Sequence, residues 1–84
     1  MQTNKDLRQE VFSIVDEQIR TNNPPETAET FERLKKEGFS DFDAKQMIGQ
    51  CLSVEMFETL SNKELFDHKR FVENLNDLPG EPEN

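Results

Sequence analysis

The sequence lacks Trp and Tyr, contains a single Cys, and is only 32% hydrophobic. One cysteine excludes an internal disulfide framework and is typical of proteins in a reducing compartment. No apolar run approaches the roughly 18 residues that a membrane-spanning helix requires, and residues 1–10 have no apolar segment of the kind found in secretion signals. We therefore expect a cytoplasmic protein without a membrane partner.

Positive charge is the second shortage, because 10 Lys and Arg stand against 18 Asp and Glu, for a net charge of -8. Proteins that bind DNA or RNA need clustered cations to displace counterions from phosphates. Arg33, Lys35 and Lys36 form the tightest basic group, but they fall in an expected last helical turn, where cations complement the helix dipole. We therefore expect no nucleic-acid binding by the folded surface.

A chain of 84 residues forms one domain at most. A domain of this size buries little more than about 60% of its unfolded surface, so its core must be thin. A dimer that shares apolar surface would compensate for such a core. We expect a single helical domain over residues 1–78 and a flexible tail over residues 79–84, which have no helical periodicity.

Apolar residues recur at helical spacing and predict four helices, at about residues 5–20, 24–36, 41–60 and 67–76. The first helix has one apolar stripe, formed by Leu7, Val11, Ile14, Val15 and Ile19. The third is the longest and is apolar over more than one face. Gly49 within it, with Ser53 one turn later, indicates a face that another helix can approach closely. The prediction is an all-α bundle of four helices around a long central third helix.

The end of the second helix is the most specific local prediction. Gly38 follows a run of helix-forming residues, which is typical of a helix ended by a left-handed glycine. Phe39 should then fold back onto Leu34 or Phe31. Ser40 is expected to cap the third helix. A helix, a one-residue reversal and a second helix predict a tightly docked hairpin.

Two other helix ends have capping signals. Asn23 is expected to cap the second helix, with Pro24 at its first position and Glu26 bonded back to the cap. Phe66 and Phe71 flank the start of the fourth helix at the spacing of a hydrophobic staple.

The residues that carry chemistry do not form a known motif. The sequence has no glycine-rich phosphate loop, Gly-x-Ser-x-Gly, Cys-x-x-Cys or His-Glu-x-x-His. Glu55 and Glu58 are spaced to face one metal, and His68 opens the fourth helix, so a small metal-dependent enzyme is one alternative. We predict instead that both carboxylates are solvated, that His68 faces solvent and that Cys51 is a buried hydrophobe. No catalytic, cofactor-binding or metal-binding residue is predicted, and the chain is not expected to be an enzyme.

Phe31, Leu34, Gly38-Phe39-Ser40, Ala44 and Ile48 resemble the helix, Gly-Phe loop and helix start of ubiquitin-associated domains. The resemblance implies a three-helix bundle that binds peptides through the loop and the last helix, and it predicts an exposed Phe39. The third helix expected here is about twice the length that such a domain uses.

A second resemblance covers most of the chain. It is carried by Asn23-Pro24-Pro25-Glu26-Thr27, Gly38-Phe39-Ser40, Glu55-Met56-Phe57-Glu58, Phe66-Asp67 and Leu78-Pro79. These residues are similar to those of a group of short, all-helical bacterial proteins whose function is not established. The similarity implies a bacterial, cytoplasmic protein and carries over no functional residue.

Our main functional hypothesis is a non-catalytic module for protein–protein interaction or self-association in the bacterial cytoplasm. The third helix is apolar over too wide an arc for three neighbouring helices to cover. Phe39, Phe42, Met47 and Met56 are the candidate interaction residues, and Phe57 would extend the same surface. The alternative, that these residues fill the core, is the more economical interpretation at helical spacing in a short chain, although some member of the set must stay exposed.

Overall fold

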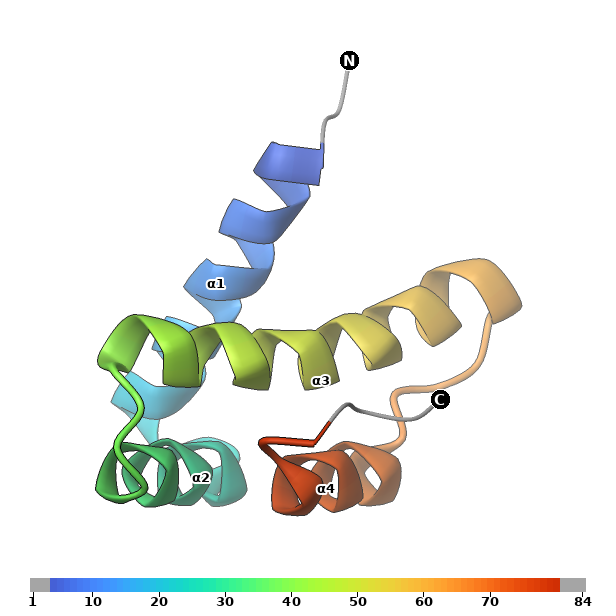
Figure 1. The fold of residues 1–84 in the computed structure, drawn as a ribbon. Coiled ribbons are helices and arrows are strands. Elements are labelled where there is room, and N and C mark those ends of the chain that lie inside the picture. The colour runs from blue at the N-terminus through green and yellow to red at the C-terminus, as the bar shows by residue number, and fades with distance from the viewer. Residues whose placement is uncertain (1–3, 81–84) are drawn as a thin grey trace.

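The computed structural model describes residues 4–80, with side chains from residue 7 onward, and it is all-α over that range (Figure 1). Its four helices are α1 (Asn4–Thr21), α2 (Pro25–Lys36), α3 (Asp41–Asn62) and α4 (His68–Asp77). Each predicted helix exists, and each boundary agrees with the sequence-based prediction to within two residues. No helix in the described part of the chain is long and apolar enough to cross a membrane.

The helices form a small bundle in which α3 lies across α2 and α4 (Figure 1). α1 crosses behind α3, and its first turns rise above α3 on the side away from α2 and α4. α3 is the longest helix, with 22 residues, and it contacts the other three. α2 also contacts the other three, whereas α1 and α4 do not meet over the described residues. α2 therefore shares the central position that was predicted for α3.

The core contains side chains from all four helices and one residue beyond α4. Its buried hydrophobic members are Val11, Val15, Phe31, Leu34, Ala44, Ile48, Cys51, Leu52, Phe71, Leu75 and Leu78. Leu7 was predicted to belong to the apolar stripe but is 48% exposed, because the first turns of α1 extend past α3.

Gly49 on α3 faces Val11 on α1. A Cβ added there would be 3.2 Å from Val11 Cγ1, so the absence of a side chain lets the two helices approach. This confirms the predicted close approach at Gly49. Ser53, one turn later, remains exposed.

The reversal between α2 and α3 has the predicted form. Gly38 has a φ of +103°, the Phe39 N–H donates to Leu34 O at 3.1 Å, and the Gly38 N–H donates to Lys35 O at 3.0 Å. This pair of bonds is a Schellman motif. Ser40 caps α3 by accepting from the Asp43 N–H at 3.1 Å. Phe39 is half-buried and packs against the core, as a helix-ending glycine requires.

The predicted capping at the start of α2 is wrong by one residue. Pro24, not Asn23, is the residue before the helix, and no side chain caps this end. The Asn23 N–H instead donates to Gln18 O at 3.0 Å, which keeps Asn23 at the end of α1. The inward face of α2 also includes the buried Thr27, whose hydroxyl donates to Gln18 Oε1 at 3.0 Å.

Arg33 has a role that its position on α2 did not predict. Its Nη2 donates to Leu75 O at 2.9 Å and its Nη1 to Leu78 O at 3.0 Å, so it satisfies carbonyls at the end of α4. A cation at a helix C-terminus interacts favourably with the helix dipole. Arg33 thus complements the dipole of α4 rather than only that of its own helix. Leu78 is buried, Pro79 and Gly80 are exposed, and the rest of the predicted tail lies outside the described residues.

Candidate interaction groove

An open groove of about 1140 Å³ lies between α1 and the face of α3 that α2 and α4 leave free. Its lining is Arg8, Gln9, Val11, Phe12 and Ser13 from α1, with Phe42, Gln46, Gly49, Gln50, Ser53, Val54 and Phe57 from α3. Phe42 is 62% exposed and Phe57 is 57% exposed. Two large aromatic side chains therefore stand in solvent on one face of one helix.

The helix crossing accounts for the shape of this groove. At Gly49 the helices touch, whereas away from that point α1 rises away from α3 (Figure 1). Phe12 and Phe42 stack across the groove with ring centroids 5.5 Å apart. Lys45 on α3 pairs with Asp16 on α1 at 2.7 Å, which is a second contact between the two helices.

The groove has little charge for so acidic a protein. Of the described residues that line it, only Arg8 is charged, and the other polar members are Gln and Ser. The centre of a protein interface is likewise depleted of charged residues, because charges are costly to desolvate.

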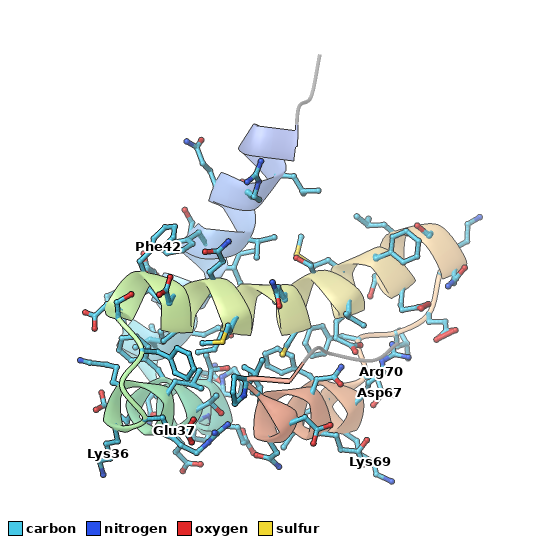
Figure 2. The ribbon with its side chains drawn as sticks, in the orientation of Figure 1. Lys36, Glu37, Phe42, Asp67, Lys69 and Arg70 are labelled. Carbon is cyan, nitrogen blue, oxygen red and sulfur yellow. The ribbon has the colours of Figure 1, made fainter. Side chains whose placement is uncertain are left out.

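The four predicted interaction residues do not form one surface. Phe42 lines the groove, and Figure 2 shows it on the side of α3 that faces α1. Phe39, Met47 and Met56 are half-buried and pack against the core, so they are not part of the lining. The lining residues Gln46 and Gln50 were not predicted, although they fall on the same face as Phe42 and Phe57 at helical spacing.

The prediction that Glu55 is solvated is wrong. Its side chain is fully buried and accepts three hydrogen bonds: from Arg70 Nε at 2.6 Å, from Arg70 Nη2 at 3.0 Å and from the Asp67 N–H at 2.9 Å. The hydrogen bonds to Glu55 raise the pKa of Arg70 further above its usual value. Figure 2 shows Asp67 and Arg70 at the start of α4. Glu55 therefore anchors α4 to α3.

Glu58 and His68 do not join Glu55 in a metal site. Glu58 is also buried, contrary to prediction, and accepts a hydrogen bond from the Asn62 side chain. His68 is exposed, as predicted, with its Nε2 3.7 Å from Glu26 Oε2 on α2. Among the residues described here, no three His, Cys, Asp or Glu side chains lie close enough together to bind a metal ion.

Cys51 is a buried core residue, as predicted. It is 0% exposed, and burial raises the pKa of its thiol to about 12. A thiol in this environment is not a nucleophile at neutral pH, because the thiolate is the reactive form.

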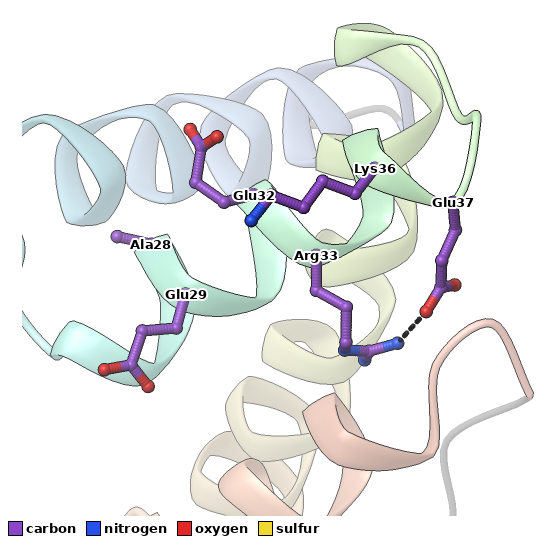
Figure 3. Close-up of a pocket in the computed structure, with 6 residues that line it drawn as sticks. All are labelled: Ala28, Glu29, Glu32, Arg33, Lys36 and Glu37. Atoms are coloured by element: carbon purple, nitrogen blue, oxygen red, sulfur yellow. Dashed lines mark hydrogen bonds and ion pairs between the residues drawn. The ribbon is translucent and has the colours of Figure 1, made fainter.

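A second hollow, of about 590 Å³, lies on the outer side of α2 (Figure 3). Its lining comes from α2 and the residue that ends it: Ala28, Glu29, Glu32, Arg33, Lys36 and Glu37. Arg33 there is occupied by Glu37 at 2.9 Å and by the carbonyls at the end of α4. Because Arg33 is already paired, this hollow is a weaker candidate binding site than the groove.

Comparison with protein-family models, with curated proteins and with solved structures found no match to this chain.

Proposed function

We propose that this protein is a non-catalytic interaction module that binds the apolar face of a helix in the groove between α1 and α3. The observation that carries the proposal is the exposure of Phe42 and Phe57, each more than half exposed in one open groove. Exposed apolar side chains that gather in one groove with a polar rim are typical of interaction sites.

The shape of the groove favours a helix over an extended strand. Two crossed helices border it, and a third helix can lay its side chains between theirs. Helices that bind in this way anchor residues three and four positions apart. The Gln and Ser side chains of the lining can hydrogen-bond polar residues at the edges of the bound helix without adding charge to the groove. An extended strand would need a sheet edge, and the described residues contain no strand.

The remaining parts of the proposal have separate support. A non-catalytic role agrees with the engagement of Glu55 by Arg70 and with the burial of Cys51. A cytoplasmic location agrees with one buried free thiol, and a bacterial origin rests on the resemblance described above. The partly buried Phe39 favours the groove over the Gly-Phe loop as the binding surface.

A photo-crosslinking experiment tests the proposal. Gln50 is exposed and lines the groove, so p-benzoylphenylalanine at this position should crosslink to a protein in living cells. The captured peptide should carry apolar residues three and four positions apart. The same probe at Glu73, which is exposed on α4, serves as the control.

A Phe57→Asp change should abolish the crosslink from position 50. The proposal fails if position 50 gives no product, or if Phe57→Asp leaves the product unchanged.

A further inference from the structure

We infer that the occupant of the groove is an amphipathic helix of another protein, with one carboxylate at the edge of its apolar face. Arg8 pairs with that carboxylate and thereby selects the partner. The inference rests on the proposed function, because it concerns the same groove between α1 and α3. Three features of the groove support it: an unpaired arginine, an otherwise uncharged lining and an elongated shape.

Arg8 differs from the other arginines of the chain. Each of those pairs with a carboxylate: Arg20 with Glu17 at 2.6 Å, Arg33 with Glu37 at 2.9 Å and Arg70 with Glu55 at 2.6 Å. Among the side chains that the structure describes, from residue 7 onward, no carboxylate pairs with Arg8. Carboxylates are abundant in this chain, with 18 Asp and Glu against 10 Lys and Arg. Arg8 therefore remains available in the groove for a carboxylate of the partner.

The rest of the lining limits the charges that the partner can bring. Its other polar residues are Gln and Ser, which are uncharged. A charged side chain that docked against them would lose its water without gaining an opposite charge, which is costly. Beside Arg8 a carboxylate is favoured, because guanidinium and carboxylate form two parallel hydrogen bonds. The net charge of -8 disfavours a strongly acidic partner, including a second copy of this chain, so the contact holds one carboxylate rather than several.

The groove is elongated along α3. Its lining runs from Phe42 to Phe57 on α3 but only from Arg8 to Ser13 on α1. At a rise of 1.5 Å per residue, these stretches are about 22 Å and about 8 Å long. A partner helix that lies along α3 therefore needs about 15 residues, or about four turns. Its apolar face contacts Phe42 and Phe57, and the edge that faces α1 carries the carboxylate for Arg8.

Selection from a displayed peptide library tests the inference, with the full chain as bait. The library consists of alanine-rich peptides of about 18 residues, long enough to form helices, with randomised residues on one face and its edges. Wild type should enrich peptides that carry apolar residues three and four positions apart and Asp or Glu at one fixed position relative to them. Arg8→Glu should enrich Lys or Arg at that position instead, because the charge in the groove is reversed.

Lys69→Glu is the matched control, since it makes the same change in net charge. Lys69 is exposed on α4, across α3 from the groove (Figure 2), so this variant should keep the preference of wild type. An enriched wild-type peptide should bind Arg8→Glu at least about tenfold more weakly, and a Lys in place of its carboxylate should restore the affinity. Calorimetric titration measures both effects. Circular dichroism should show an unchanged helix content in each variant.

The outcomes separate this inference from the proposed function. Enriched peptides that share the apolar spacing but no fixed carboxylate overturn the role of Arg8 and leave the helix-binding groove standing. The same conclusion follows if the carboxylate persists in peptides that Arg8→Glu selects. If wild type enriches no peptide above the level of Phe57→Asp, both the inference and the proposed helix-binding site fail. A crosslink from position 50 to a second copy of this chain overturns the inference as well, because the occupant is then not another protein.

Discussion

Loss of either member of the Glu55–Arg70 pair should destabilise the fold, and loss of Arg70 should cost more than loss of the Glu55 charge. Glu55 is completely buried, whereas the Arg70 side chain is 23% exposed. Glu55→Gln removes the charge that three donors share, and the Arg70 guanidinium that remains can still reach water. Hydrogen bonds to charged groups contribute about 1.5–3 kcal/mol, so we expect Glu55→Gln to lower the free energy of unfolding by about 2 kcal/mol. Arg70→Met should cost more, because it leaves a carboxylate buried with only the Asp67 N–H as partner.

Thermal and urea denaturation, followed by circular dichroism, measure both effects. In a domain of 60–100 residues, 1 kcal/mol shifts the melting temperature by about 4–8 °C, so Glu55→Gln should melt roughly 10–15 °C below wild type. The Glu55→Gln/Arg70→Met double variant should be less destabilised than the sum of the two changes, because the residues are coupled. Lys45→Met is a matched control, since it removes a more peripheral pair with Asp16 at 2.7 Å.

Two results would refute this reasoning. One is a Glu55→Gln variant that melts within a degree or two of wild type, which would show that the three hydrogen bonds contribute nothing net. The other is an Arg70→Met variant that is more stable than Glu55→Gln. That order would mean that the carboxylate reaches solvent once its partner is lost.

Further predictions concern single sites and charge. Gly38→Ala should destabilise by about 1 kcal/mol or more, through backbone strain alone because no atom lies near its Cβ position; an unchanged melt contradicts this. Burial raises the pKa of Cys51 to about 12, whereas a thiol in the unfolded chain ionises near pH 8.5. Any stability advantage of wild type over Cys51→Ala should therefore be full below about pH 8.5 and shrink above it, because only the unfolded state then loses its proton. Urea titrations at pH 7 and pH 10 test that trend, and a constant difference refutes it. Mobility-shift titrations with DNA and RNA at low salt should show no saturable binding at micromolar protein.

The helices could be predicted because their signals are local. Periodicity, the glycine at position 38 and the cap at Ser40 act within a few residues, and the structure contains all three. The Phe66–Phe71 staple is also present, with ring centroids 5.5 Å apart. Errors at the start of α2 arose where one signal competed with another, since Asn23 could end α1 or begin α2.

The roles of the charged residues could not be predicted, because they depend on contacts distant in sequence. Arg70 is 15 positions from Glu55, and Arg33 is 42 positions from the Leu75 carbonyl that it binds. A carboxylate on a helix looks the same in sequence whether it is solvated or buried against a guanidinium. The groove could be predicted only in part, for a related reason. The apolar excess of the third helix is a sequence property, but which face stays uncovered depends on where α1 crosses.

The amphipathicity of the helices connects the fold with the groove. A helix that only packs against a core needs one apolar face, and α2 and α4 have that pattern, with polar residues opposite. α3 does not divide in this way, because its inner face holds Ile48 and Leu52 while its outer face holds Phe42 and Phe57. The outer aromatic residues contribute little to the fold, since more than half of each side chain remains in water. Their cost in solubility is understandable if the apolar face of a partner helix covers them, as proposed for the groove.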